Sequence, residues 1–234
     1  MTLNKKKKQL KLKDKKLMPS KYKIDYRIIT TMGVAVICLV MLVIFPTQKE
    51  NLFQQYVSGL AFLALIPFLY IRIILKKDVR FFGLQPGNVR KGIFWTAVSF
   101  ATSFLMVFLA QKYLGLSEKY GAPQLIFSEF TRFLFYAFLI TAPWAALYEF
   151  FFRGFLLFGT EENIGYWAVI LQFAIFALMI AFFKNPMSMI FYVIAAPFSG
   201  IIAYQSRSLI YSFFYSWIFI VICSAAVIKF TPTP

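Results

Sequence analysis

Long apolar stretches separated by short polar segments run along most of the chain. A helix that crosses a lipid bilayer needs about 20 mainly apolar residues, because each backbone polar group in hydrocarbon must be satisfied within the segment. Seven stretches approach or reach this length: 28–46, 56–75, 92–110, 132–157, 166–183, 189–205 and 209–229. The pattern predicts an all-α, polytopic transmembrane helix bundle of about seven spans.

Polar joints separate these stretches and predict where the helices end. The joints are residues 47–55, 76–91 and 111–131, followed by short turns at 159–165, 184–188 and 206–208. In the turn at 159–165, Thr160 precedes Glu161 and Glu162, a pattern typical of a helix N-cap with an acidic first turn. We therefore interpret these two glutamates as structural.

The composition of the chain indicates that most of its surface contacts lipid rather than water. The chain is 60% hydrophobic and 15% charged, with a mean hydropathy of +0.70, whereas an average soluble domain is about 45–50% apolar and about 25% charged. No polar segment is long enough to enclose a separate water-soluble core. We expect one membrane domain over residues 28–230, preceded by a tail.

The net charge of +16 is concentrated in that tail. Residues 1–27 carry eleven basic side chains against two aspartates. Basic residues beside a span are retained in the cytoplasm and attract anionic lipid headgroups. We interpret this segment as a cytoplasmic tail on the lipid surface and not as a nucleic-acid-binding element.

The joint at 76–91 predicts the same orientation. It carries five basic residues against Asp78 alone, and two spans separate it from the tail. Both basic segments then lie on the cytoplasmic side, and a count of seven spans places the C-terminal TPTP outside. We expect a multi-pass protein of a bacterial cell membrane.

Few residues offer chemistry inside the apolar stretches. Cys38 and Cys223 both lie within spans and predict neither a disulfide framework nor a metal site, and we expect no cofactor. Glu129 and Arg132, at the entry to the fourth span, are interpreted as an interfacial pair.

Glu149 and Arg153 stand out because charged side chains at membrane depth cost a few kcal/mol and persist with a partner. They lie four residues apart, which places them on one helical face with the carboxylate N-terminal to the guanidinium. Taken alone, the pair indicates a structural salt bridge that fixes this helix to its neighbours.

Four segments around this pair resemble one family. YEFFFRGFLLF (148–158) resembles the first motif of the CAAX prenyl protease and bacteriocin-processing family of intramembrane endopeptidases, which has two glutamates, three residues and an arginine. The segments LQFAIFALMI (171–180) and SRSLIYSFFYSWIFI (206–220) resemble the family's second and last motifs, and FFGLQPGNVRKGIFW (81–95) resembles a stretch upstream. The resemblance covers residues 80–222, roughly the family's catalytic core.

The chain departs from the family pattern at its catalytic positions. Aligning Arg153 with the motif arginine leaves Glu149 as the second glutamate and puts Tyr148 in place of the first. Aligning Phe176 with the phenylalanine of the second motif puts Ile180 where the family has histidine.

The last motif is altered in the same way. Ser216 stands at its histidine position and Ile220 at its asparagine position, and the chain contains no histidine. A water-activating site needs a base beside the water and a donor aimed at the oxyanion. Tyrosine is a poor base near neutral pH, and isoleucine can neither bind a proton nor ligate a metal.

These losses favour a catalytically degenerate member of the family, a pseudoenzyme that acts as a binding or scaffold subunit for a membrane-protein partner. Two alternatives stay open: an active intramembrane endopeptidase that uses Glu149, and a transporter or channel component. The family reading predicts that Tyr148, Glu149, Ile180, Ser216 and Ile220 converge on one cavity within residues 132–229.

Packing is the default explanation for the remaining features. Phe150, Phe151 and Phe152 are expected to fill helix surfaces toward lipid. Gly200, with Ala196 and Ala203 on the same stretch, is expected to allow close contact with another helix.

Overall fold

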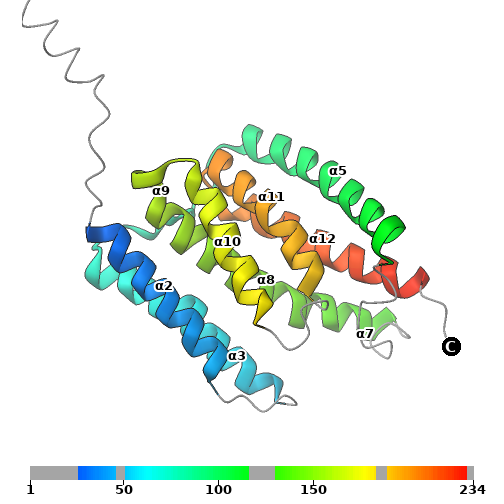
Figure 1. The fold of residues 1–234 in the computed structure, drawn as a ribbon, viewed down its shortest axis with the longest axis horizontal. Coiled ribbons are helices and arrows are strands. Elements are labelled where there is room, and N and C mark those ends of the chain that lie inside the picture. Colours follow the sequence, from blue (N-terminus) through cyan, green and yellow to red (C-terminus); the bar gives the residue numbers. More distant parts are fainter. Residues whose placement is uncertain (1–25, 46–50, 116–129, 183–188, 231–234) are drawn as a thin grey trace, which may run out of the picture.

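The computed structural model describes residues 26–45, 51–115, 130–182 and 189–230 (Figure 1). The basic tail, Glu129 and the C-terminal TPTP lie outside these ranges. The described helices are α2 (Tyr26–Ile44), a continuous helix Leu52–Ile74 that begins with α3, the 3-10 helix η3 (Val79–Phe82), α5 (Val89–Leu114), a helix Phe130–Ile164, α10 (Trp167–Ala181), α11 (Ile190–Ser206) and α12 (Leu209–Phe230).

The described part of the chain contains helices and their connections and no strand, so the predicted all-α bundle is confirmed. Five helices are long and apolar enough to cross a membrane, and α10 and α11 are shorter apolar helices. Each of the seven corresponds to one predicted stretch, with boundaries that shift by a few residues. The exception is the fourth, which extends well beyond its predicted end.

The helix Phe130–Ile164, called the long helix below, continues through the predicted turn at 159–165. It ends at Gly165, whose φ of 58° is a backbone conformation that favours glycine. The Thr160 hydroxyl donates to the carbonyl of Leu156 at 2.8 Å, one turn back, and does not cap a new helix. The N-cap interpretation of Thr160 is therefore wrong, and Glu161 and Glu162 belong to a helix C-terminus.

A C-terminal position is unfavourable for carboxylates, because the helix dipole places partial negative charge there. Both carboxylates are paired with cations from other segments. Arg207 binds Glu161 through two contacts of 2.5 and 2.6 Å, and Lys77 binds Glu162 at 2.7 Å. These pairs hold the ends of three chain segments together.

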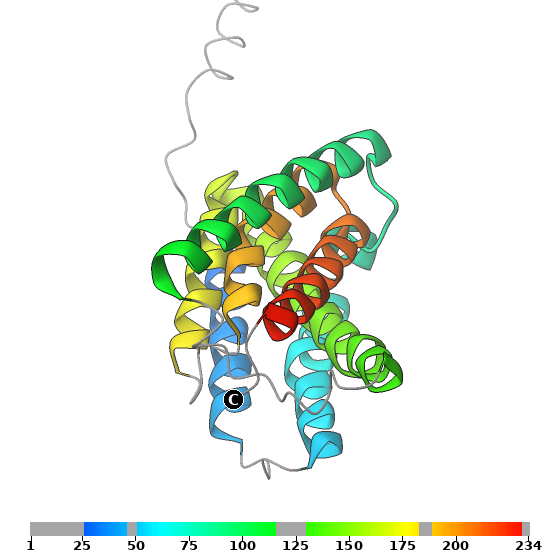
Figure 2. The same cartoon turned by 90° about the vertical axis from the view of Figure 1, so that its right-hand side faces the viewer.

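The long helix lies at the centre of the bundle. Its middle part packs against α10, α11 and α12, while α2 and α3 lie on one side of the molecule and α5 on the opposite side (Figures 1 and 2). A helix that is enclosed on all sides can be apolar all round. The buried segment Glu149–Leu157 of the long helix consequently supplies five of the twelve largest fully buried side chains.

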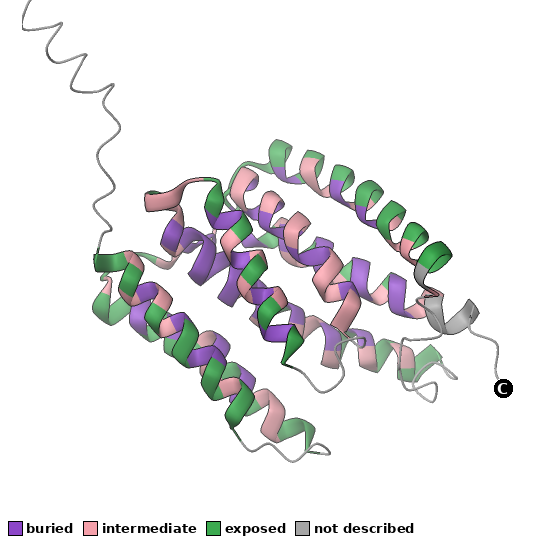
Figure 3. Cartoon of the chain, viewed as in Figure 1, coloured by how far each residue is buried: buried purple, intermediate pink, exposed green. Residues whose placement is uncertain are grey.

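This central position corrects the expectation for the phenylalanine run. Phe151 and Phe152 are completely buried and Phe150 is partly buried, so the three do not form a lipid-facing surface. The helix continues into Phe155, Leu156 and Leu157, which are also fully enclosed. The exposed apolar side chains lie mainly on the outer helices, and α5 in particular buries few residues (Figure 3).

Gly200 allows α11 to approach α10 closely, as predicted. A Cβ at Gly200 would lie 2.5 Å from Nε2 of Gln172 and 3.2 Å from Cγ1 of Val169, both on α10. Ala196 and Ala203 are fully buried beside it. The small residues thus bring the α11 backbone within hydrogen-bonding reach of α10 side chains.

Pro143 leaves a backbone carbonyl of the long helix without its usual donor. Proline has no N–H to offer the carbonyl of Leu139, four residues earlier. The Tyr56 hydroxyl on α3 donates to that carbonyl at 2.8 Å. An unsatisfied carbonyl is costly in hydrocarbon, so this bond is favourable. It also joins α3 to the long helix.

Candidate functional site

Glu149 and Arg153 lie at the middle of the long helix, in its π-helical segment η6 (Glu149–Leu157). Short π-helical segments within α-helices are frequent at functional sites. The two side chains are only 2% and 3% exposed. Glu149 Oε1 and Arg153 Nη1 are 3.7 Å apart, so the pair is a loose ion pair rather than a bidentate one.

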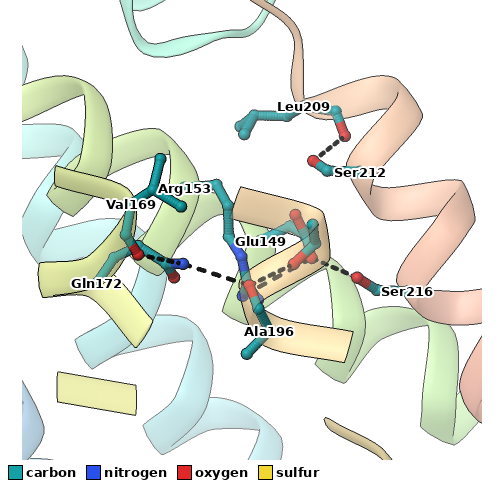
Figure 4. Close-up of polar contacts among 9 residues, drawn as sticks. Glu149, Arg153, Val169, Gln172, Ala196, Leu209, Ser212 and Ser216 are labelled. Atoms are coloured by element: carbon teal, nitrogen blue, oxygen red, sulfur yellow. Dashed lines mark hydrogen bonds and ion pairs between the residues drawn. The ribbon is translucent and has the colours of Figure 1, made fainter. Parts of the chain in front are cut away.

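The closest partner of Glu149 comes from another helix. Ser216 on α12 donates from its hydroxyl to Oε1 of Glu149 at 2.6 Å (Figure 4). Ser216 is itself buried. Ser216, which was predicted to correspond to the histidine of the family's last motif, therefore satisfies one oxygen of the carboxylate.

Arg153 reaches a third helix. Its Nη2 donates to the backbone carbonyl of Ala196 on α11 at 3.1 Å. The same oxygen accepts from Nε2 of Gln172 at 3.3 Å (Figure 4). It also accepts from Oγ of Ser199 at 3.1 Å. The Ala196 carbonyl oxygen therefore accepts from three donors. Its negative charge is only partial, so it does not neutralise the guanidinium.

Sequence reasoning missed Gln172 and the Ala196 carbonyl. Gln172 is a single amide in an otherwise apolar stretch, and it is completely buried. A polar side chain at membrane depth is itself a signal of an interior position, so Gln172 could have been singled out. The carbonyl of Ala196 could not, because every residue has one.

A small cavity lies beside the carboxylate. Its lining combines residues of the long helix, α10, α11 and α12: Ala145, Tyr148, Glu149, Arg153, Phe176, Tyr192, Ala195, Ser216 and Ile220. It has room for about one water molecule.

The structure brings most of the predicted motif positions to this cavity. Tyr148, Glu149, Ser216 and Ile220 line it, and so does Phe176. The expectation that Ile180 also lines it is wrong. Ile180 is buried one turn beyond Phe176, near the end of α10, where it belongs to the apolar core.

Aromatic rings surround Tyr148, which lines the cavity. The Tyr148 ring contacts the rings of Trp144, Phe152, Phe176 and Tyr192, with centroid distances between 5.6 and 6.3 Å. The Arg153 guanidinium lies 5.7 Å from the centroid of Phe176. Such a shell excludes bulk water and strengthens the electrostatic interactions that it encloses.

Two polar atoms of the central pair have no hydrogen-bond partner within the described residues. They are Oε2 of Glu149 and Nε of Arg153, and both are buried. A buried polar atom normally has a protein or water partner. The arrangement places a carboxylate between a guanidinium and a water-sized cavity, and one of its oxygens has no partner among the described residues.

The described residues offer no metal site. No group of three or more His, Cys, Asp or Glu side chains in this part of the chain is arranged to hold a metal ion. Cys38 and Cys223 are both buried and unbridged.

Comparisons of the chain with protein-family models, with curated proteins and with solved structures find no match.

Proposed function

We propose that this chain is a catalytically degenerate relative of the CAAX prenyl protease and bacteriocin-processing family, which acts in the membrane as a binding or scaffold subunit. The observation that carries the proposal is the burial of Glu149 and the set of residues that bind or face its carboxylate. This carboxylate is buried, and its Oε1 is bound by Ser216 and faced by Arg153. The positions that resemble the family's motifs surround it, with the exception of Ile180.

The same neighbourhood argues against hydrolysis. Water activation needs a base and a second polar group that stabilises the developing oxyanion, each contributing typically 10²-fold or more. Here the position of the first motif glutamate is Tyr148, enclosed by aromatic rings, and the position of the last motif asparagine is Ile220. A cavity with room for about one water also leaves no space for a peptide beside the carboxylate.

One observation favours the alternative, an intramembrane endopeptidase that uses Glu149. Oε2 of this carboxylate lacks a hydrogen-bond partner among the described residues, and Glu149 lines the cavity. A free carboxylate oxygen beside a water-sized space is the arrangement that a general base requires.

A cleavage assay separates the two functions. Purified full-length protein in proteoliposomes is incubated with prenylated CAAX peptides, and products are measured by mass spectrometry. We expect no cleavage above that of Glu149→Gln. Because Glu149→Gln alone can destabilise the fold, the double variant Glu149→Gln with Arg153→Met serves as a second carboxylate-free control. Proteolysis that depends on Glu149 overturns the pseudoenzyme proposal.

The binding role has its own test. Tagged protein is isolated from its native membrane in mild detergent, and co-purifying membrane proteins are quantified by mass spectrometry. We expect a partner in stoichiometric amount that is retained by the double variant, because binding does not need the carboxylate. If nothing co-purifies beyond what an unrelated membrane protein of equal abundance captures, the scaffold role is rejected.

We further propose that the protein resides in the cell membrane with its N-terminus in the cytoplasm. The basic side chains near the start of α5 support this orientation. Lys91 and Lys112 are exposed near opposite ends of α5, and the two native cysteines are buried. In intact cells an impermeant thiol reagent should label Lys112→Cys and spare Lys91→Cys. The reverse pattern contradicts the orientation.

A further inference from the structure

The connection between the helix Leu52–Ile74 and α5 is fixed to the end of the bundle by hydrogen bonds. The N–H of Asn88 donates to the carbonyl of Ser206 at 2.7 Å, and the N–H of Leu209 donates to the carbonyl of Gly83 at 2.9 Å. The Ser208 hydroxyl donates to the carbonyl of Gln85 at 2.6 Å. The side chains of this connection are therefore presented from a fixed backbone.

The acidic side chains at this end are already engaged. Glu161 binds Arg207 and Glu162 binds Lys77. The third carboxylate, Asp78, accepts from the backbone N–H of Arg80 at 3.0 Å. Among the described residues, no other acidic side chain lies at this end to neutralise further cations.

Five basic side chains remain without a side-chain partner within the described ranges. They are exposed, and they flank or belong to the fixed connection: Arg72, Lys76, Arg80, Arg90 and Lys91. We call this set the basic collar. Of the carboxylates nearby, only Asp78 is not paired with a cation, so the collar keeps a net positive charge.

Exposed apolar side chains are interleaved with the collar. Phe81 and Leu84 follow Arg80, and Val89 precedes Arg90. Phe81 also carries the Lys77 ammonium over its ring, 4.0 Å from the centroid. Alternating cationic and apolar side chains are favourable at the boundary between headgroups and acyl chains, because the cations can contact headgroups while the apolar side chains contact acyl chains.

We propose that the basic collar is a binding surface for anionic phospholipid headgroups. It is formed by the folded domain, is separate from the basic tail, and does not depend on the proposed function. The interleaved Phe81, Leu84 and Val89 point to a lipid and not to a soluble phosphate, because only a lipid also offers them acyl chains. Headgroup phosphates bind the collar cations, and these apolar side chains contact the acyl chains below.

Native mass spectrometry of the delipidated full-length protein tests the proposal. The protein is titrated separately with phosphatidylglycerol and phosphatidylcholine, and the apparent dissociation constants are compared. We expect tighter binding of phosphatidylglycerol. Each of Arg80→Gln, Arg90→Gln and Lys91→Gln should weaken it about fivefold, the change that corresponds to ~1 kcal/mol per basic residue. The triple variant should weaken it by more than tenfold.

Lys112→Gln is the matched control, because it removes one exposed charge near the opposite end of α5. It should leave the phosphatidylglycerol constant unchanged, and thermal melts should show that all variants are folded. Equal loss in Lys112→Gln, or no loss in the triple variant, overturns the proposal. If soluble glycerol phosphate competes as well as the lipid, the ligand is a free phosphate ester and the lipid proposal fails.

Discussion

Ser216 and Glu149 are joined by a buried hydrogen bond of 2.6 Å, although 67 positions separate them in the chain. The bond ties α12 to the middle of the long helix. The carboxylate oxygen that accepts this bond also lies 3.7 Å from Nη1 of Arg153, so Ser216 and Arg153 share one partner atom.

Removal of the Glu149 charge should be costly. Glu149→Gln leaves the Arg153 guanidinium buried with only a carbonyl partner, and breaking a buried pair costs about 3–5 kcal/mol. Arg153→Met in the same chain should restore part of that loss, since no unpaired charge remains. Unfolding in mixed detergent micelles measures the free energies. If the double variant is less stable than Glu149→Gln, the pair is not a structural unit.

Glu161→Gln is the control for this prediction. The Glu161–Arg207 pair has shorter contacts than the Glu149–Arg153 pair, but the Arg207 side chain is 54% exposed. Solvent-exposed pairs contribute about 0–1 kcal/mol. Glu161→Gln should therefore lower the unfolding free energy by much less than Glu149→Gln.

Ser216→Ala should lower the free energy of unfolding by about 1.5–3 kcal/mol, the range for a hydrogen bond to a charged group. Ser212→Ala is the matched control. Ser212 is buried on the same helix, but its hydroxyl donates to the nearby Leu209 carbonyl and links no second helix (Figure 4). Denaturant titration of both variants measures the difference. Equal effects would mean that the Glu149 contact contributes nothing beyond a local bond.

Tyr56→Phe should cost about 1 kcal/mol, because it removes the hydroxyl that satisfies the Leu139 carbonyl. Pro143→Ala in the same chain should reduce the cost, since alanine supplies the missing backbone N–H. A double-mutant cycle measures this coupling. Additive effects of the two substitutions contradict the proposed role of Tyr56.

Gly87→Ala should loosen the connection before α5. Gly87 has a φ of 59°, and a Cβ there would overlap the backbone carbonyl oxygen of Ser206. Gly165 is the control, because its φ is also positive, at 58°, but a Cβ there would meet no atom within 4 Å. Hydrogen exchange at the Asn88 and Leu209 amides should rise in Gly87→Ala. If Gly165→Ala raises it equally, the steric overlap is not the cause.

The positions of the helices could be predicted from the sequence because spanning is a local property. A stretch of suitable length and hydropathy forms a helix in lipid whatever its neighbours are, since the backbone must satisfy itself. Length and hydropathy predicted the seven stretches. The small residues around Gly200 predicted the close contact of that stretch with another helix. Likewise, the spacing of Glu149 and Arg153 placed them on one face.

Only the tertiary structure decided how these helices enclose the pair. Thr160 fits an N-cap in sequence, but Arg207 and Lys77 supply cations that stabilise Glu161 and Glu162 at the C-terminus of a longer helix. Phe151 fits a lipid-facing surface equally well, because lipid and protein interior are both apolar and hydropathy does not distinguish them. The Ala196 carbonyl became a partner of Arg153 because α10, α11 and the long helix converge there, which no local pattern records.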